Sequence, residues 1–339
     1  MKALLIGGTG TISTAITERL TNEPGWEVWL LNRGNRPIPG RAKQIVCDIR
    51  DESTAAERLR DLSFDAVCEF VGFQKADVER DYRLFRGKTK QYIFISSASA
   101  YHKPAANYLV SEGTTLANPY WEYSRNKIAC EAFLMEKYRE EGFPVTVVRP
   151  SHTYGERAVP VCLHGKNGSW QVLRRMLDGK PVIIPGDGTS LWTLTFHHDF
   201  AVGFTGLMGN RHAIGESFQI TGDETLTWNQ IHETIADALG AELHPYYVSS
   251  AYLADVGKKY GYDFEGGLLG DKAVSVVFDN TKLKRLVPQM TTTTPFHRGV
   301  RRALEYILAH PEECQTEDPE FDAWCDRVIE AQEASKARI

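Results

Sequence analysis

The sequence predicts an α/β protein whose larger domain is a doubly wound parallel sheet of the Rossmann type, followed by a smaller C-terminal domain. Three observations lead to this prediction. Short apolar runs alternate with segments of helical spacing through the first half of the chain. A glycine-rich turn directly follows the first apolar run. After Arg149-Pro150 the alternation loosens, and His, Pro and Gly become frequent. Strands that alternate with helices form right-handed βαβ units, whose helices cover both faces of a parallel sheet.

The apolar runs are short enough to be buried strands, and the longer segments between them have the spacing of helices. Strands are expected at residues 3–6, 27–31, 44–47, 66–71, 92–96 and 145–148. Helices are expected at residues 11–20, 53–62, 75–85, 123–141, 169–177, 199–208, 228–239, 249–256 and 296–309. We therefore expect a Rossmann domain over 1–150, a mainly substrate-binding domain over 151–310 with segments that return to the first domain, and an acidic helical tail over 311–339.

The composition excludes several classes of protein. The chain has 44 acidic and 39 basic residues, a formal net charge of −5, which argues against nucleic-acid binding through a broad basic surface. The six cysteines include no C-x-x-C pair, so neither a zinc knuckle nor a disulfide framework is expected. No apolar stretch is long enough for a signal-peptide core or a membrane span, and we expect a cytoplasmic protein without a membrane partner.

The glycine-rich turn covers residues 7–13, with the sequence GGTGTIS. Gly7 and Gly10 occupy the first two positions of a G-x-x-G-x-x-G pattern, and Ser13 occupies the third. Such a turn lets the backbone approach a pyrophosphate at the N-terminus of the next helix, which here begins with Thr11 and Ile12. Because the turn lies between a strand and a helix at the start of a βαβ series, it predicts a dinucleotide site.

The end of the second strand bears on which dinucleotide is bound. NAD enzymes usually carry an acidic residue there for the ribose hydroxyls, whereas this chain has Asn32-Arg33-Gly34, with Arg36 nearby. A guanidinium can pair with a 2′-phosphate, so NADP(H) is favoured over NAD. In the other interpretation Arg33 is a solvated loop residue, and NAD is bound without the usual carboxylate. Asp48, with Ile49 after it, is expected at the adenine edge.

Tyr123 and Lys127 lie four residues apart and therefore on one face of a predicted helix. Oxidation of an alcohol needs a base for the hydroxyl proton while hydride passes to nicotinamide. A free phenol titrates near pH 10, so a neighbouring ammonium has to lower its pKa before it serves as that base. Ser96-Ser97, at the end of a predicted strand, supplies hydroxyl donors at the carboxyl edge of the sheet. Together these residues predict an oxidoreductase.

At this point the chain resembles the extended short-chain dehydrogenase/reductase superfamily, in its NAD-dependent epimerase/dehydratase family. The motifs that carry the resemblance extend over nearly the whole chain, at residues 7–13, 48, 96–101, 123–127, 149–155, 186–188, 198–201 and 278–282. The resemblance implies that Ser97 polarises the substrate oxygen, that Tyr123 is the acid/base and that Lys127 holds the nicotinamide ribose. It places Phe70 and Val71 beside the cofactor. It also implies a homodimer that packs the Tyr123 helix against its mate.

Three departures from the family pattern limit what the resemblance implies. Trp192 stands where nucleotide-sugar epimerases carry an arginine for the substrate diphosphate. Ala98-Ser99 replace the Asp-Glu pair of sugar 4,6-dehydratases, which disfavours dehydration. The fourth strand ends in Glu69-Phe70-Val71 where small residues are usual, and Glu69 is expected either to face solvent or to touch the ribose. These departures resemble atypical superfamily members, including chloroplast stem-loop RNA-binding relatives.

The expected reaction is hydride transfer between nicotinamide and a secondary alcohol or ketone of a sugar or a substrate similar to a nucleotide sugar. The alternative is a non-catalytic module that binds NAD(P) and contacts RNA or protein. No metal is expected, because His197-His198-Asp199 is interpreted as helix capping and packing. The candidate substrate contacts are Ser99, Tyr101, His152, His164 and Trp192.

Overall fold

The computed structural model describes residues 1–339, and it confirms the predicted fold class. Its centre is a seven-stranded parallel sheet with the strand order β3-β2-β1-β4-β5-β7-β11. The order reverses at β1, as in a doubly wound sheet, so a crevice opens at the carboxyl ends of the strands. The strands are β1 (Lys2–Ile6), β2 (Glu27–Asn32), β3 (Lys43–Val46), β4 (Ala66–Glu69), β5 (Tyr92–Ile95), β7 (Val145–Pro150) and β11 (Ser217–Ile220).

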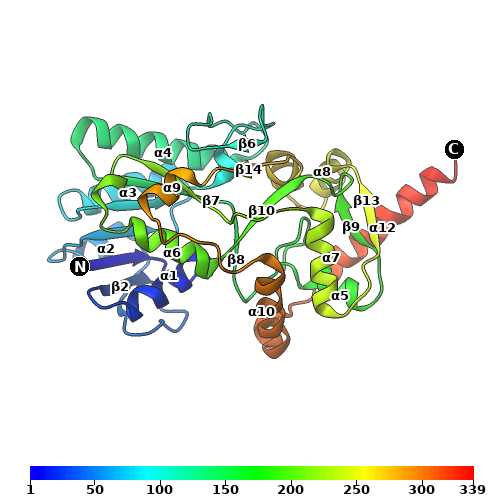
Figure 1. The fold of residues 1–339 in the computed structure, drawn as a ribbon, viewed down its shortest axis with the longest axis horizontal. Helices are drawn as coiled ribbons and strands as arrows, with labels where there is room; N and C mark the ends of the chain where they lie inside the picture. The colour runs from blue at the N-terminus through cyan, green and yellow to red at the C-terminus, as the bar shows by residue number, and fades with distance from the viewer.

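Two helical layers cover the sheet because each strand presents buried side chains on both faces. One layer packs Ile16 and Phe204 against the sheet, and the other packs Val78 and Leu134. The first layer consists of α1 (Thr11–Asn22), α6 (His197–Leu207) and α9 (Thr281–Leu286). The second consists of α2 (Glu52–Arg58), α3 (Lys75–Phe85) and α4 (Glu122–Glu141). Figure 1 shows both layers around the sheet at the N-terminal end of the molecule.

Residues from the second half of the chain return to this sheet. β11 pairs with β7 in parallel, with Phe218 opposite Val148, and α6 packs beside α1. α6 begins at His197, two residues before the start expected from sequence, and the strand expected at 66–71 already ends at Glu69. The expected Rossmann region is thus completed by segments beyond residue 150.

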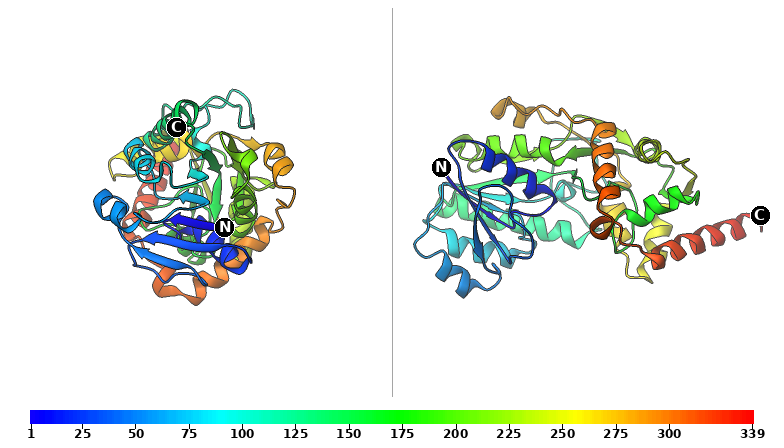
Figure 2. Two further views of the ribbon diagram at one scale, coloured as in Figure 1. Left: turned by 90° about the vertical axis from the view of Figure 1, so that its left-hand side faces the viewer. Right: turned by 90° about the horizontal axis from the view of Figure 1, so that it is seen from below.

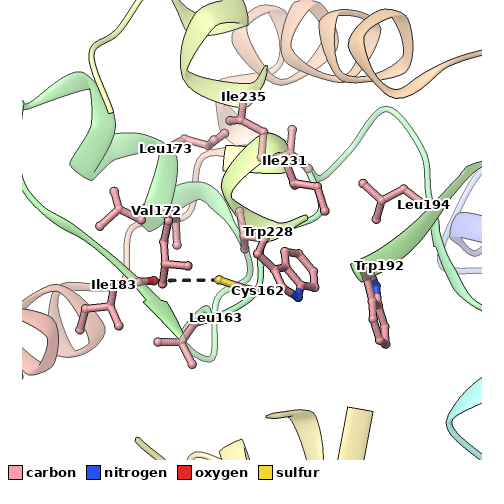
Figure 3. Packing of buried hydrophobic residues seen from close by; sticks show 14 of the residues in the cluster. Cys162, Leu163, Val172, Leu173, Ile183, Trp192, Leu194, Trp228, Ile231 and Ile235 are labelled. Atoms are coloured by element: carbon pink, nitrogen blue, oxygen red, sulfur yellow. Dashed lines mark hydrogen bonds between the residues drawn. The ribbon is translucent and has the colours of Figure 1, made fainter. Parts of the chain in front are cut away.

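A second hydrophobic cluster of 37 buried residues lies apart from the sheet. Trp192 and Trp228 stack inside it with ring centroids 5.8 Å apart, and Figure 3 shows Trp228 beside Cys162 and Ile231. The helices are α5 (Trp170–Leu177), α7 (Trp228–Leu239), α8 (Ser250–Lys258), α10 (Phe296–Ala309), α11 (Pro311–Cys314) and α12 (Pro319–Lys336). The strands are β8 (His152–Tyr154), β9 (Val182–Pro185), β10 (Leu191–Phe196), β12 (Thr225–Thr227) and β13 (Pro245–Val248).

The strands of this second region were not expected from the sequence. β8 lies in the segment after Pro150 where His, Pro and Gly are frequent, and it pairs in parallel with β10, which pairs in turn with β12. A short ladder of β6 (Leu109–Val110) and β14 (Val277–Phe278) joins the two regions. These strands are two to six residues long, and their partners lie far away in sequence, so local periodicity carries no signal for them.

α12 combines a packed beginning with a projecting end. Phe321, Trp324 and Val328 are buried in the second cluster, whereas residues after 332 are exposed. Figure 2 shows the end of the helix extending away from the body of the molecule. None of the helices in this structure is both long and apolar enough to cross a membrane.

Candidate active site

A cleft of about 480 Å³ opens at the carboxyl ends of β1, β2 and β4. Eight of the ten residues expected only to bind cofactor line it: Gly7, Gly10, Asn32, Arg33, Asp48, Ile49, Phe70 and Val71. Thr11 and Ile12 do not line it, because they form the first turn of α1 and the Thr11 carbonyl faces the His197 ring. Lys127 does not line this cleft either.

The glycine-rich turn has a backbone that a side chain would disturb. Gly7 has φ +108°, and a Cβ atom there would lie 3.1 Å from Val71 Cγ1. Ser13, at the third position of the glycine pattern, is buried, and its Oγ accepts a hydrogen bond from Gly10 N at 2.9 Å. The serine is thus small enough for the position and also holds the turn closed.

The end of β2 offers polar groups but no carboxylate. Asn32 Oδ1 accepts hydrogen bonds from Gly34 N and Gln44 Nε2, while Asn32 Nδ2 is buried without a partner. Arg33 is exposed at the rim, and Arg36 Nη1 donates to Thr9 O at 2.9 Å. A buried donor without a partner normally implies a ligand or a water. The unpaired amide beside an open glycine turn therefore fits a dinucleotide with its ribose at Asn32.

Ser97 and Tyr123 meet at a second cleft, of about 240 Å³. Ser97 lies two residues after the end of β5. Its Oγ lies 2.9 Å from Ser99 Oγ, which in turn accepts a hydrogen bond from Ser124 Oγ at 2.7 Å. Burial raises the pKa of Tyr123, and the Ser97 hydroxyl opposes that rise by hydrogen bonding. Ser97 and Tyr123 therefore lie together on the wall of this cleft.

Lys127 lies behind Tyr123, with its Nζ 5.8 Å from the centroid of the tyrosine ring. The side chain is buried, and Nζ donates to the carbonyls of Gly72 and Ile95 at 2.7 Å each. Burial lowers the pKa of Lys127 to about 8. The two carbonyls place its charge between the loop after β4, which borders the cofactor cleft, and the strand that leads to Ser97.

Both interpretations of Glu69 offered from sequence are wrong. Glu69 is fully buried, does not line the cofactor cleft, and accepts a hydrogen bond from Val71 N. Burial and the neighbouring Asp81 carboxylate raise its pKa well above the usual range. Asp81 itself is bound by Arg80 at 2.8 Å and by the Tyr92 hydroxyl at 2.7 Å. α3 covers this end of β4, so the carboxyl belongs to a buried polar network rather than to the cleft.

Three of the five candidate substrate residues, Ser99, His152 and Trp192, line the second cleft with Ser97 and Tyr123. Tyr101 does not, because its hydroxyl points the other way and donates to Gln219 Oε1 at 3.0 Å. His164 also lies outside the cleft walls, with its Nδ1 2.7 Å from Gly165 O. Trp192 is 4% exposed and packs on Trp228, so most of its ring serves the core rather than the cleft.

The second cleft also has walls that the sequence analysis did not single out. They include Lys103, Trp121, Asp271, Lys272 and Phe278. Lys103 is 2% exposed and burial lowers its pKa, while burial raises the pKa of Asp271. Burial also lowers the pKa of His152 to about 3. Only tertiary structure brings these residues together, because Asp271 lies in the π-helix Glu265–Lys272, far along the chain from Lys103.

These polar groups are not paired with one another. Lys103 Nζ lies 6.0 Å from the centroid of the Trp192 ring and donates no hydrogen bond within the chain. The Asp271 carboxylate and the His152 ring likewise have no hydrogen-bond partner in the protein. A buried cation, an acid and an imidazole that face one small cleft without partners are suited to a polar ligand that supplies them.

Comparison with known proteins agrees with this geometry. A model of the NAD dependent epimerase/dehydratase family matches residues 3–221. The chain is 27% identical to a chloroplast stem-loop binding protein of 41 kDa from Arabidopsis thaliana, over 78% of this chain and 70% of that one. It is 25% identical to 2′-dehydrokanamycin reductase from Streptomyces kanamyceticus, over 75% of this chain and 71% of that one.

Among solved structures, the fold is similar to that of UDP-glucuronic acid 4-epimerase from Bacillus cereus, determined with UDP-glucuronic acid and NAD. The TM-score is 0.72 at 19% identity, over 91% of this chain and 99% of that chain. At this identity the likeness concerns the fold, whereas the family match covers well over half of the sequence. The chain therefore belongs to the NAD dependent epimerase/dehydratase family and is an NAD-dependent enzyme of the extended short-chain dehydrogenase/reductase type.

Proposed function

We propose that this enzyme moves hydride between a nicotinamide cofactor and a secondary alcohol or ketone of a sugar or nucleotide-sugar-like substrate. The observation that carries the proposal is the position of Lys127. Its ammonium donates to Gly72 O, next to the cofactor cleft, and to Ile95 O, at the end of the strand that leads to Ser97, while Tyr123 on the same helix lines the second cleft. The charge thus lies at the boundary where a nicotinamide ring and a substrate would meet.

In this proposal Tyr123 accepts the proton of the substrate hydroxyl as its phenolate and returns it in the reverse direction. Lys127 favours the phenolate through its charge, and Ser97 donates a hydrogen bond to the substrate oxygen. The bound nicotinamide supplies the hydride acceptor and, by its positive charge, further lowers the pKa of the phenol, which burial alone raises. Ser99 and Ser124 orient the Ser97 hydroxyl through their chain of hydrogen bonds.

The second cleft indicates what kind of substrate is held. Lys103, Asp271 and His152 offer a cation, an anion and a neutral imidazole to one small space, with Trp121 and Trp192 as apolar walls. Sugars present hydroxyls to such groups and a less polar ring face to aromatic side chains. Lys103 suits an anionic substituent, such as a carboxylate or a phosphate, in place of the arginine that Trp192 replaces. The reaction is an epimerisation if the ketone can rotate in this cleft and take the hydride back on its opposite face. It is a net reduction or oxidation if the ketone cannot rotate.

For the cofactor we propose that NADP(H) is accepted in preference to NAD(H). The support is the absence of a carboxylate at the end of β2 and the presence of Arg33 and Arg36 at the cleft. Asn32 offers its unpaired amide to a ribose hydroxyl without repelling a 2′-phosphate.

The family resemblance also leads us to propose a homodimer through α4, which light scattering after gel filtration would test. The non-catalytic alternative is not proposed. A binding module would not need Ser97 and Tyr123 at one cleft with the Lys127 ammonium close behind them.

The test of this proposal is the Tyr123→Phe variant. General acid–base catalysis is worth about 10²- to 10⁴-fold, so the rate at which nucleotide sugars reduce the bound cofactor falls by at least about 100-fold. Nicotinamide absorbance reports the reaction. Cofactor affinity, measured by fluorescence titration, stays at the wild-type value because the phenol does not line the cofactor cleft. Tyr120→Phe, three residues earlier and 36% exposed, is the matched control. Full activity in Tyr123→Phe would refute the mechanism.

A further inference from the structure

Glu156, His197 and His198 form a cluster outside both clefts. Glu156 follows β8, and the two histidines are the first two residues of α6. Glu156 Oε2 lies 2.8 Å from His197 Nε2, and Glu156 Oε1 lies 3.4 Å from His198 Nε2. One ligand-capable atom from each of the three residues lies within 4.8 Å of the others.

The environment of His197 determines which of its ring nitrogens is free. His197 is 4% exposed, and its Nδ1 lies 3.0 Å from the backbone carbonyl of Thr11. A carbonyl oxygen only accepts hydrogen bonds, so Nδ1 carries the proton, and a neutral ring then presents a lone pair at Nε2. Gly155 permits this approach, because a Cβ atom there would lie 3.0 Å from His197 Nδ1. A backbone carbonyl that fixes the ring in this way is the usual outer partner of a metal-binding histidine.

His197 Nε2 has no hydrogen-bond partner although it is buried and close to a carboxylate. The distance of 2.8 Å between Nε2 and Glu156 Oε2 is short enough for a hydrogen bond. The contact fails as a hydrogen bond because the in-plane direction of Nε2 does not point at that oxygen. Two ligands of one ion behave in this way, because each points at the ion and not at the other. Atoms that each lie about 2.1 Å from a common ion are about 3.0–3.4 Å apart at angles from square to tetrahedral. The 3.4 Å distance to His198 lies in this range and the 2.8 Å distance to His197 is slightly shorter, and the two distances end on different oxygens of the Glu156 carboxylate.

We propose that Glu156, His197 and His198 bind one divalent ion of the zinc class. Two imidazoles and one carboxylate suit Zn²⁺, Co²⁺ or Ni²⁺ better than Mg²⁺ or Ca²⁺, which prefer oxygen ligands. Three protein ligands leave a further position for water. The His198 side chain is 46% exposed and that of Glu156 is 30% exposed, so an ion can enter from solvent.

The ion would tie three segments together. Glu156 belongs to the connection after β8, the histidines begin α6, and through Nδ1 of His197 the site reaches Thr11, the first residue of α1. Thr11 belongs to the glycine-rich turn and directly follows Gly10, so the ion supports the helix whose N-terminus faces the cofactor cleft without occupying that cleft.

The competing account is a plain ion pair. Glu156 raises the pKa of His198 by hydrogen bonding, and the carboxylate pairs with a protonated imidazole. In that account protonated His198 and Glu156 satisfy each other, and the protein binds no ion at this place. The metal account predicts that the protein binds one ion per chain near neutral pH, whereas the ion-pair account predicts no binding at this place.

The experiment uses the full chain after removal of metals with a chelator, titrated calorimetrically with Zn²⁺. One ion binds the wild type. Glu156→Gln and His198→Ala weaken binding by at least about tenfold, the smallest loss that even an outer-sphere partner causes. His297→Ala, an exposed histidine at the second position of α10, leaves binding unchanged. The absorption of the Co²⁺-loaded protein shows nitrogen and oxygen ligands and no thiolate charge-transfer band.

Any of three results overturns the proposal. The wild type shows no saturable Zn²⁺ binding, or Glu156→Gln and His198→Ala both bind Zn²⁺ as tightly as the wild type, or the Co²⁺-loaded protein shows a thiolate band. Circular dichroism and cofactor titration of each variant show whether it has folded. If both variants fail to fold, the wild-type stoichiometry and the Co²⁺ spectrum decide. None of these readouts depends on the proposed enzymatic activity. The metal proposal can therefore be tested even if the proposed activity is not found.

Discussion

The two clefts of this enzyme are built in opposite ways. The cofactor cleft is lined by the backbone of a glycine-rich turn and by strand ends that follow one another closely in sequence, from Ile6 to Val71. Most of its polar groups already have partners, among them Ser13 with Gly10 and Arg36 with Thr9. The second cleft draws its walls from Ser97 to Phe278 and keeps Lys103, Asp271 and His152 without hydrogen-bond partners.

This difference shows that the chain keeps buried charged groups without partners in the second cleft and not in the first. A cleft made of backbone is stable by itself and recognises a pyrophosphate that many proteins share. A cleft with buried unpaired charges destabilises the free protein, and a substrate that pairs with those charges recovers the loss. Substitutions of the charged residues in the second cleft are therefore expected to raise the stability of the protein and lower its activity. Substitutions in the glycine-rich turn of the first cleft are expected to lower both stability and cofactor affinity.

The sharpest test of this contrast is Lys103→Met. Removing a buried ammonium that lacks a partner raises the free energy of unfolding by about 1 kcal/mol or more, measured by urea denaturation. The same change lowers kcat/KM by about tenfold to a hundredfold, because a hydrogen bond to a charged group is lost in the complex. Cofactor affinity is unchanged. Lys90→Met, at an exposed lysine paired with Asp65, is the control. A variant that is both less stable and fully active would show that Lys103 has a purely structural role.

For the first cleft the matching change is Gly7→Ala. The backbone at Gly7 has φ +108°, and a Cβ atom would press on Val71 and Phe70, so the turn has to move. Strain of this kind costs about 1–3 kcal/mol, and we expect cofactor affinity to fall by about tenfold with a parallel loss of stability. Gly25→Ala provides the control, since Gly25 has φ +101° with nothing within 4 Å and lies outside the cleft. It should lose stability but keep cofactor affinity. Equal cofactor affinity in both variants would show that the Gly7 turn does not contact the dinucleotide.

The sequence could predict the first cleft because its residues lie close together along the chain. A strand, a glycine turn and a helix define Gly7, Gly10 and the end of β2 by local pattern alone. Ser97 and Tyr123 were also predicted from local pattern, Ser97 from its place with Ser96 at the end of a predicted strand and Tyr123 from its four-residue spacing to Lys127 on one helix face. Lys103 and Asp271 carry no such pattern, because the cleft that joins them depends on a π-helix and on short strands paired across the chain.

The fate of Glu69 shows a second limit. Sequence places it correctly at the end of β4, but its surroundings depend on α3, which brings Asp81 and Arg80 over that end. Tyr101 fails for a similar reason, since Gln219 on β11 and Arg149 on β7 draw its hydroxyl away from the cleft. Periodicity in the sequence predicts which residues lie in a strand. The partner of a buried polar group can be identified only when the position of the neighbouring helices and strands is known.

A smaller effect is expected at the rim of the cofactor cleft. Arg33→Ala removes an exposed guanidinium, so NADPH affinity falls by up to about tenfold, while NADH affinity stays unchanged. Fluorescence titration with both nucleotides measures the ratio. Arg50→Ala is the control, because Arg50 lines the same cleft on the other side of Asp48. If wild type binds NADH more tightly than NADPH, the proposed preference for NADP(H) is wrong, and Arg33 is only a solvated loop residue.

The last effect concerns the buried wall behind the cofactor cleft and appears mainly in its pH dependence. The folded-state pKa of Glu69 is raised, so between its ordinary pKa and that raised value the folded chain holds a proton that the unfolded chain has released. The free energy of unfolding therefore falls as pH rises through this window, by at most about 1.4 kcal/mol per pH unit. Glu69→Gln removes that slope, changing stability little in acid and raising it relative to wild type towards alkaline pH.

Asp65, just before the start of the same strand, gives the opposite sign. Its pKa is lowered by the hydrogen bond from Lys90, so its contribution is present above the ordinary carboxyl pKa and is lost as pH falls through the folded value. Asp65→Asn should therefore flatten the acid side of the stability curve, whereas Glu69→Gln flattens the neutral side. Urea denaturation from about pH 2 to about pH 9 measures both curves, because the lowered pKa of Asp65 lies below the ordinary carboxyl value. If Glu69→Gln shows the same pH slope as wild type, Glu69 is ionised in the folded chain, and the buried network behind the cofactor cleft then holds a further negative charge.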